Sequence, residues 1–225
     1  MNSAIIVAAG GSRRMGFDKL SAPLGGRPVL GHSLLAFERC ADIAEVIVVT
    51  APDREPLVRS LAAEAGLSKL AAIVPGGAER HLSVWNGLQA AHSSAKTVAV
   101  HDGARPLVTP AAISRCLAAA AEHGAASLAH PIADTLKRAD ADRRVVGSVS
   151  RDDLWAMETP QCFETGLLRR AYERILDGGD LVTDEVSAVE ALGEPVFLVE
   201  NPEPNPKITY PADLALAEAI LAGRR

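Results

Sequence analysis

The chain has 225 residues, of which 48% are hydrophobic, 23% charged and 4% aromatic, and its formal net charge is −5. This composition is typical of a globular protein with a sizeable core, and the length suits one domain, expected to span residues 1–225. The acidic balance and the few aromatic side chains argue against a nucleic-acid partner, because phosphate backbones attract basic surfaces and single strands stack on aromatic rings.

The sequence also lacks the patterns of membrane and secreted proteins. No apolar run approaches the roughly 18 residues of a membrane span, and the apolar segment 4–9 is followed by arginines where a secretory signal would have them first. Its three cysteines cannot all pair and have no CxxC spacing, and its six histidines show no zinc-ligand spacing. We therefore expect a cytoplasmic protein with reduced thiols, no membrane partner and no structural zinc.

Short β-branched runs alternate with alanine- and leucine-rich stretches of helical length in the first half of the chain. The runs predict strands at 3–8, 45–50, 71–74 and 97–101. The stretches between and after them predict helices at 29–40, 54–65, 81–92 and 111–123. This alternation predicts an α/β fold of three layers, Rossmann-like, with a mostly parallel sheet and helices on both faces.

The alternation stops between about Ile132 and Arg151, where two polar runs of β type flank an acidic turn. We expect a protruding β-arm at about residues 132–153. Further on, the pattern predicts helices at 166–176, 186–192 and 211–221 and a strand at 195–200. Alternating prolines keep residues 201–206 extended, in a stiff loop that ends at Lys207.

Ligands of such sheets bind beyond the carboxyl ends of the strands. The first of these ends runs into a glycine-rich turn, residues 8–19, which carries Arg13, Arg14 and Lys19. Its small residues let backbone N–H groups approach a ligand and form a concave anion site. The turn therefore predicts binding of a polyanion; the alternative is a surface turn whose cations face water.

Two common nucleotide motifs are excluded at this turn. Residues 11–16 have the spacing of a Walker A loop, but Phe17 and Asp18 stand where that motif needs Lys and Ser or Thr. The dinucleotide fingerprint fails as well, because Ser12 and Met15 replace two of its glycines. A P-loop enzyme and a dehydrogenase are both disfavoured.

Two further strand ends and one helix start carry candidate groups. The Gly76-Gly77 turn could contact the edge of a base, although such a turn before a helix is also an ordinary connection. Asp102 and Arg105 could hold Mg²⁺ through a carboxylate and a phosphate through a guanidinium, while Asp102 could also be a turn residue that bonds its own backbone. Residues 183–185, Thr-Asp-Glu, indicate a helix start with a hydroxyl cap and acids at its positive end.

Together, and in this order along nearly the whole chain, these motifs resemble the 2-C-methyl-D-erythritol 4-phosphate cytidylyltransferases of the non-mevalonate isoprenoid pathway. The matching segments are residues 8–16 with Lys19, 76–80 with Ser83, 101–106, 134–138, Arg151, 159–161, 183–185 and Lys207. The resemblance implies a nucleotidyltransferase fold and transfer of CMP from CTP to the methylerythritol phosphate, giving 4-diphosphocytidyl-2-C-methyl-D-erythritol and pyrophosphate. It also implies Mg²⁺ and a homodimer whose arms reach across to the neighbouring subunit.

The resemblance further implies a role for each matching residue. Arg14 and Lys19 would stabilise the triphosphate in the transition state, and Asp102 would face the metal. The methylerythritol phosphate would be bound by Arg105, Arg151 and Lys207. Thr183 would contact the substrate, and Thr135 and Arg151 would serve the partner's site. The cytidine site would be lined by Ala8, Ala9, Gly10, Gly77, Ser83 and Gly103.

The chain departs from the family pattern at a few of these positions. Alanine stands at position 78, where the family often has Asp, and glycine at 103, where it often has Ala. Asp18 and Leu20 flank the lysine where the family often has Pro and Gln. An alanine at 78 offers no polar side chain to the nucleotide.

The implied chemistry explains why the sequence shows no Ser-His-Asp or Cys-His arrangement. A phosphate monoester has a second pKa of about 6, so the nucleophile is mostly dianionic at neutral pH and needs no general base. Two anions must meet at the α-phosphorus, so cations are expected on both sides of it. Arg14, Lys19 and Mg²⁺ would serve the triphosphate, and Arg151 with Lys207 the incoming phosphate.

Two other functions fit parts of the pattern. A cytidylyltransferase for another polyol phosphate, such as ribitol 5-phosphate, would share the nucleotide half of the site. A non-catalytic regulator would keep the glycine turn and bind a nucleotide without turnover.

Overall fold

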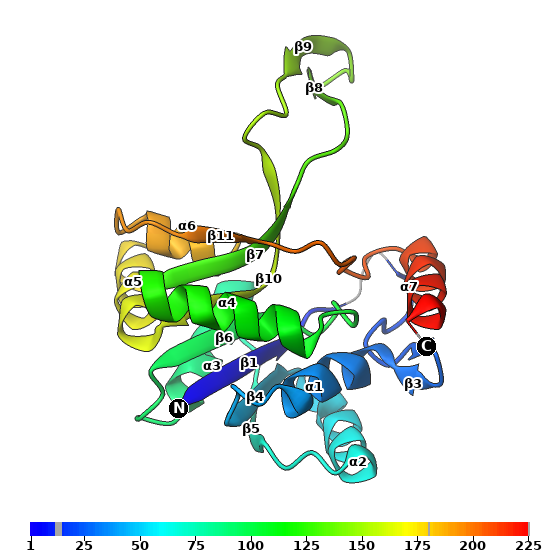
Figure 1. Ribbon diagram of the computed structural model, residues 1–225, viewed down its shortest axis with the longest axis vertical. Coiled ribbons are helices and arrows are strands. Elements are labelled where there is room, and N and C mark those ends of the chain that lie inside the picture. The colour runs from blue at the N-terminus through cyan, green and yellow to red at the C-terminus, as the bar shows by residue number, and fades with distance from the viewer. Residues whose placement is uncertain (12–14, 180, 225) are drawn as a thin grey trace.

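A seven-stranded sheet in the order β11-β7-β10-β6-β1-β4-β5 organises the computed structural model, which describes residues 1–11, 15–179 and 181–224 (Figure 1). Its strands are β1 (Asn2–Ala8), β4 (Glu45–Thr50), β5 (Leu70–Pro75), β6 (Thr97–Asp102), β7 (Ala125–Pro131), β10 (Trp155–Glu164) and β11 (Phe197–Glu200). Parallel pairs join β1 to β4 and β6, β4 to β5, and β11 to β7. Strand β10 runs antiparallel between β6 and β7. The prediction of an α/β fold with a mostly parallel sheet is confirmed.

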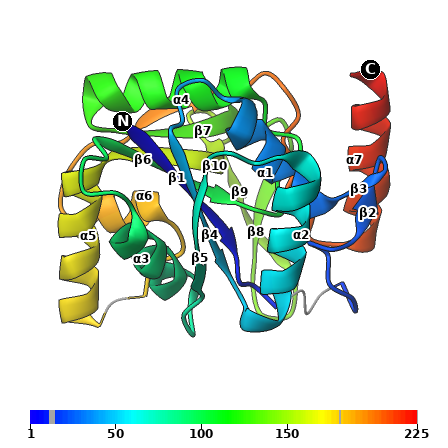
Figure 2. The ribbon, with the colours of Figure 1, turned by 90° about the horizontal axis from the view of Figure 1, so that it is seen from below.

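Helices cover both faces of this sheet, and neighbouring residues of a strand pack on opposite faces (Figure 2). In β1, Ile6 packs in the cluster shared with α1 (Val29–Arg39), α2 (Glu55–Ala65) and α4 (Pro110–His123). Its neighbour Ile5 packs on the other side with α3 (Arg80–Ala90), α5 (Thr165–Gly178) and α6 (Glu185–Glu190). Because both faces are covered, every residue of β4 is buried, and its sequence is an almost continuous apolar run.

The predicted helices and strands agree with the observed bounds to within two residues, because turn and cap residues mark their ends. Thr109 caps α4 by accepting a hydrogen bond from the Ala112 amide, and Pro110 opens the helix. Gly66 and Gly179 end α2 and α5 in the left-handed conformation. The last helix, α7 (Pro211–Gly223), packs beside the small hairpin of β2 (Pro23–Leu24) and β3 (Arg27–Pro28).

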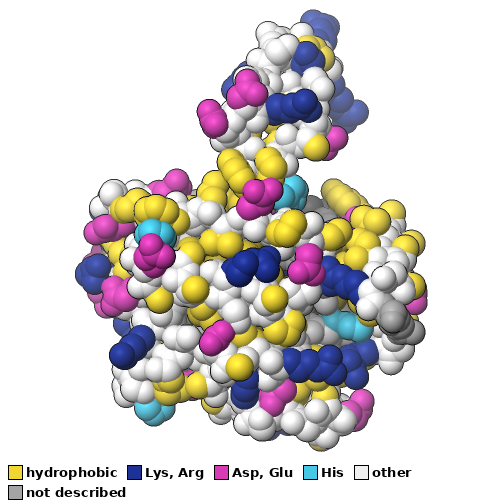
Figure 3. Space-filling model, in the orientation of Figure 1, with side chains coloured by type: hydrophobic (Ala, Val, Ile, Leu, Met, Phe, Trp, Pro, Cys, Tyr) yellow, Lys and Arg dark blue, Asp and Glu magenta, His cyan; other side chains and the backbone are white. Residues whose placement is uncertain are grey.

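The arm is a separate two-stranded sheet of β8 (Leu136–Ala139) and β9 (Val145–Val149), and it projects away from the body of the protein (Figure 1). The chain leaves the central sheet at the end of β7 and returns through β10. Basic side chains gather on the arm (Figure 3), and the apolar Val145 and Val146 near its tip are exposed. The described residues of the rest of the protein do not pack against the β8–β9 hairpin (Figure 1).

The three cysteines, Cys40, Cys116 and Cys162, are all buried and free. Burial raises the pKa of the Cys162 thiol well above its ordinary value, with further contributions from Cys116. The prediction of unpaired thiols is confirmed. Separately, none of the helices in the described ranges is long and apolar enough to cross a membrane.

Candidate active site

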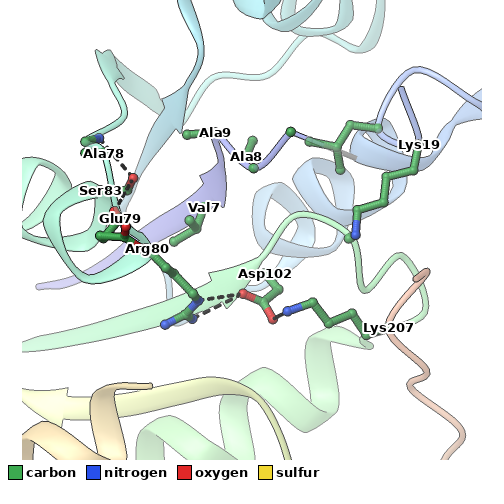
Figure 4. Close-up of a pocket in the computed structure, with 15 residues that line it drawn as sticks. Val7, Ala8, Ala9, Lys19, Ala78, Glu79, Arg80, Ser83, Asp102 and Lys207 are labelled. Atoms are coloured by element: carbon green, nitrogen blue, oxygen red, sulfur yellow. Dashed lines mark hydrogen bonds and ion pairs between the residues drawn. The ribbon is translucent and has the colours of Figure 1, made fainter. Parts of the chain in front are cut away.

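A cavity of about 250 Å³ opens at the carboxyl ends of β1, β5 and β6 (Figure 4). Its wall combines the small residues of two glycine turns with charged side chains brought from four separate segments. The first turn contributes residues 8–11 and the second residues 77–80 with Ser83; Lys19, Asp102 and Lys207 complete the charged wall. The loops after Ala8, Val74 and His101, which the sequence singled out, therefore meet at one place.

The two glycine turns touch each other, and only glycine permits this contact. A Cβ atom on Gly76 would lie 2.3 Å from the Cβ of Ala9 in the first turn. A Cβ atom on Gly77 would lie 2.4 Å from the Cβ of Leu82, in the helix α3 that follows the second turn. The Ser83 hydroxyl fixes the second turn, because it accepts a hydrogen bond from the Gly77 amide at 3.0 Å and donates one to the Glu79 carbonyl at 3.1 Å. The cavity wall is thus mostly backbone at this end, as a phosphate or base site requires.

Asp102 lies between two cations, as Figure 4 shows. Arg80 donates to its Oδ1 from Nε at 3.2 Å and from Nη2 at 3.1 Å, and Lys207 Nζ lies 2.7 Å from Oδ2. Burial alone would raise the pKa of Asp102, but the charges of Arg80 and Lys207 outweigh it and hold this pKa well below its usual range. The carboxylate is therefore ionised at neutral pH.

Arg80 is itself anchored from behind by a buried acid. Its Nη1 and Nη2 donate to Glu185 Oε1 at 2.6 Å and Oε2 at 3.0 Å, and the Tyr172 hydroxyl donates to Oε1 at 3.0 Å. Burial opposes the charge of Arg80, but the carboxylates of Glu185 and Asp102 raise its pKa above the ordinary value. Burial also raises the pKa of Tyr172, and the Glu185 charge adds to the effect. The chain Tyr172–Glu185–Arg80–Asp102 fixes the position of the cavity's carboxylate.

The sequence did not point to Arg80 or Glu185 as site residues. Arg80 stands in the matching segment 76–80, but the sequence assigns it no contact. The sequence pattern explains Glu185 as an acid at the start of a helix. The structure gives the cap of α6 to the Asp184 side chain, which accepts from the Ser187 amide at 3.0 Å. The predicted hydroxyl cap is wrong, because the Thr183 side chain lies outside the helix, exposed and 3.5 Å from the Ser187 hydroxyl.

Lys19 holds the loop that delivers Lys207. Its Nζ donates to the Ile208 carbonyl at 2.7 Å, and the Ile208 amide donates to the Ala104 carbonyl at 2.8 Å. The segment next to Lys207 is thereby bonded to the first glycine turn on one side and to the loop after β6 on the other. Two lysines that are 188 positions apart in sequence face the same cavity.

His101, the neighbour of Asp102, is fully buried and does not line the cavity. Its ring bonds the Thr159 hydroxyl at 3.0 Å and the Arg105 carbonyl at 3.2 Å. Burial lowers the pKa of His101 to about 4 although the nearby Asp102 charge favours the protonated form. A neutral, enclosed imidazole packs the core beneath the site.

The structure brings most of the predicted site residues together at this cavity and leaves others apart. Those on its wall are Ala8, Ala9, Gly10, Lys19, Gly77, Ser83, Asp102 and Lys207. Gly103 packs behind it, where a Cβ would lie 2.9 Å from Leu30. Arg105 lines a second cavity of about 740 Å³, and its guanidinium donates to the Asn205 and Met157 carbonyls.

The remaining predicted residues lie on the arm, beside α6 or outside the described chain. Thr135 and Arg151 are exposed on the arm, where Arg151 donates to the Ala133 carbonyl. Thr183 is exposed next to α6. Arg14 lies outside the described residues.

Within the described ranges, no group of three or more His, Cys, Asp or Glu side chains could hold a metal by itself. Asp102 offers one ionised carboxylate on the cavity wall. Magnesium often binds through one or two carboxylates together with substrate phosphates. The donor set therefore fits a cation that arrives with a phosphate ligand.

Comparison with known proteins supports one family throughout. The family model for IspD, 2-C-methyl-D-erythritol 4-phosphate cytidylyltransferase, matches residues 2–223. Proteins of that name from Pelotomaculum thermopropionicum and Ralstonia nicotianae are 42% and 45% identical to the chain, over 99% and 98% of its length and 95% and 91% of theirs. The crystal structure of the Thermus thermophilus 2-C-methyl-D-erythritol 4-phosphate cytidylyltransferase is similar with a TM-score of 0.82 and 37% identity, covering 99% of this chain and 100% of that one.

Proposed function

The chain belongs to the 2-C-methyl-D-erythritol 4-phosphate cytidylyltransferase family, and on that premise we propose that its glycine-lined cavity is where CTP reacts with the polyol phosphate. The enzyme transfers CMP from CTP to 2-C-methyl-D-erythritol 4-phosphate in isoprenoid precursor biosynthesis. The products are 4-diphosphocytidyl-2-C-methyl-D-erythritol and pyrophosphate. The fold and the enzyme class expected from the sequence are confirmed by these relatives.

The observation that carries the assignment of the site is the gathering of Lys19, Arg80 and Lys207 around Asp102 in a cavity walled by backbone. In the reaction, an oxygen of the polyol phosphate forms a bond to the α-phosphorus of CTP. The bond between the α-phosphorus and the bridging oxygen breaks, and pyrophosphate leaves with the electron pair. Fixed positive charge lowers the repulsion between the two anions, and no proton needs to be removed.

The residues divide by the anion they would neutralise. The triphosphate would lie along residues 8–11, with Lys19 and, by family resemblance, Arg14 beside it. Lys207 and Arg105 would bind the incoming phosphate, and Thr183 a substrate hydroxyl. Asp102, which is itself bonded to Arg80, holds Lys207 in place on the cavity wall. The base of the nucleotide would contact the second glycine turn, whose Ala78 offers no polar side chain.

We propose Mg²⁺ as the cofactor, held by Asp102 and the triphosphate. The support is the low pKa of this buried carboxylate, which keeps a hard anionic oxygen on the cavity wall. When bound, Mg²⁺ supplies positive charge to the phosphates. Both Asp102 oxygens already contact a cation, Arg80 at Oδ1 and Lys207 at Oδ2. Mg²⁺ would therefore replace one of these side chains or share its oxygen.

We also propose that two copies of the chain form a dimer through their arms. The arm carries basic and acidic side chains in equal number, projects from the body and exposes Val145 and Val146, which a second copy would cover. Thr135 and Arg151 would then complete the partner subunit's site. We further propose a cytoplasmic location, which the three free, buried thiols support.

Release of pyrophosphate from CTP tests the proposed substrate directly. The purified protein should release it with 2-C-methyl-D-erythritol 4-phosphate and Mg²⁺, and not when EDTA removes the metal. Release that is equally efficient with ribitol 5-phosphate would assign a different polyol selectivity. Binding of CTP with no release in any mixture would indicate a non-catalytic regulator.

A further inference from the structure

A second cluster of polar side chains lies behind the cavity, at the root of the arm, and the motifs do not include it. At its centre is Glu158 of β10, which is only 3% exposed. Its Oε1 lies 2.8 Å from His130 Nδ1, and its Oε2 accepts hydrogen bonds from Asn201 Nδ2 at 2.9 Å and Asn205 Nδ2 at 3.0 Å. Both oxygens of a buried carboxylate are therefore used to hold other segments.

These segments are the two that the polyol-phosphate half of the site needs. His130 stands near the end of β7, where the chain leaves for the arm, and Glu158 lies on the returning strand β10. Asn201 and Asn205 bound the proline loop 201–206, and Lys207 follows two positions after Asn205. The Glu158 carboxylate joins the arm root to the loop that carries Lys207.

Two side-chain amides of the proline loop, those of Asn201 and Asn205, donate to this carboxylate. Three prolines within residues 201–206 have no N–H to donate. Asn205 Nδ2 also donates to the Thr159 carbonyl at 3.0 Å, while its Oδ1 is buried without a partner in the chain segments that the structure describes. Loss of Glu158 would leave two buried amide groups short of an acceptor, which is costly in a protein interior.

Glu158 also acts on Arg105. The Arg105 guanidinium donates to the Asn205 carbonyl at 2.8 Å and to the Met157 carbonyl at 3.2 Å, so it is bonded to both segments that Glu158 joins. Burial lowers the pKa of Arg105, and the charges of Asp102 and Glu158 oppose that change. The acid therefore favours both the position and the charge of this arginine.

We propose that Glu158 is a positioning residue for the polyol phosphate, acting through Asn205 to fix Lys207 and Arg105 against the root of the arm. This inference rests on the proposed function in taking Lys207 and Arg105 as phosphate ligands. It assigns no contact between Glu158 and either substrate. The side-chain hydrogen bonds of Glu158 and Asn205 go to the arm root, to Thr159 and to the proline loop, and not to the described residues of the glycine turns, so we expect the larger effect on the polyol phosphate.

Steady-state kinetics of four variants test this inference. Glu158→Ala should raise the KM for the polyol phosphate about tenfold or more, the scale of a lost hydrogen bond to a charged group, with the KM for CTP within about twofold. Asn205→Ala should do the same. In the double variant the two increases should not multiply, because both changes break one link. Glu173→Ala, which removes an exposed acid of α5, is the matched control and should change neither KM.

Glu158→Gln distinguishes the positioning role of Glu158 from the effect of its charge. It also replaces Glu158→Ala in the test if the alanine variant does not fold. It keeps one acceptor oxygen for the asparagines and should restore the polyol-phosphate KM to within about threefold of wild type. Hydrogen exchange of residues 201–208 without substrates should be faster in Asn205→Ala than in Glu158→Gln. Equal increases in both KM values, or increases that multiply in the double variant, would overturn the inference. If Lys207→Ala leaves the polyol-phosphate KM unchanged, the proposed role of Lys207 fails instead.

Discussion

At the scale of single residues, Asp102 determines how charge is distributed in the cavity. Both of its oxygens are bonded to cations, but with Lys19 the wall carries three positive side chains against the carboxylates of Asp102 and Glu79, so it keeps a net positive charge. Lys207 is 38% exposed, and an incoming phosphate can reach it from the cavity. Substrate binding therefore redistributes ion pairs that already exist, with little need for new side-chain order.

Lys19→Ala is expected to lower kcat by about 100-fold or more, because one preorganised charge beside the reacting phosphates is lost. The ammonium also bonds the Ile208 carbonyl, so the control must remove a similar contact elsewhere. Lys69 directly precedes β5, at the end of that strand away from the cavity, and its Nζ donates to the Cys40 carbonyl at 2.6 Å. Lys69→Ala should keep wild-type turnover, and circular dichroism should show both variants folded. Wild-type kcat in Lys19→Ala would remove this lysine from the site.

Tyr172 gives a prediction about stability at high pH. Its folded-state pKa is raised by burial and by the Glu185 charge, whereas in the unfolded chain it is about 10. The stabilisation is thus fully present below pH 10 and is lost as the pH rises toward the folded-state pKa. The unfolding free energy of wild type minus that of Tyr172→Phe should be constant from pH 7 to 9 and should then fall by about 1.4 kcal/mol per pH unit above 10. Urea unfolding at several pH values measures it, and a constant difference up to pH 11 would contradict the assignment.

At the scale of elements, the arm is a segment apart from the glycine turns, and we propose that it contributes contacts to the polyol phosphate. Arg151 is exposed and donates to the Ala133 carbonyl at the arm root. Arg151→Ala should chiefly raise the KM for the polyol phosphate, by about tenfold or more as expected for a lost charged hydrogen bond. The matched control is Arg144→Ala, which removes an arginine with a side chain 77% exposed elsewhere on the arm. Equal effects in both variants would indicate that the overall charge of the arm matters and not Arg151 itself.

Elements with a clear hydrophobic period were predictable, and those whose sequence conflicts with their structure were not. Strand β7 is alanine-rich and has no β-branched residue, so its pattern does not distinguish a strand from a loop. Strand β10 has Pro160 in its interior, and proline is normally confined to edges and bulges of a sheet. The sheet accommodates it because the pairing of β10 with β7 shifts register between Met157 and Gln161. The sequence pattern therefore does not predict β10, the antiparallel strand between β6 and β7.

The same limit applies to the candidate site. Lys19 and Asp102 stand in recognisable local motifs after strand ends and could be named from the sequence, whereas Lys207 could be named only through the family resemblance. Glu185 and Glu158 act through contacts with residues far away in the chain, such as Arg80, which is 105 positions from Glu185. No local pattern distinguishes a buried acid of this kind from an exposed one. Such supporting residues become visible only when the fold brings their partners together.

At the scale of the whole molecule, arm exchange predicts that two impaired variants rescue each other when they are assayed at polyol-phosphate concentrations well below the KM of the wild type. A heterodimer of Lys19→Ala and Arg151→Ala contains one site with both residues intact, because Arg151 would come from the other subunit. Equal mixing after dissociation and reassociation should restore about a quarter of wild-type activity, since half of the dimers are mixed and each has one complete site. The sum of the separate activities, with no gain on mixing, would mean that each subunit builds its site alone.

We expect fixed cations in the glycine-lined cavity to neutralise the phosphates of the two reactants. A crystal structure with CTP and Mg²⁺ measures this most directly. We predict that the triphosphate lies along residues 8–11, within hydrogen-bonding distance of Lys19 Nζ, and that the metal binds to Asp102. A triphosphate bound away from the first glycine turn would contradict it.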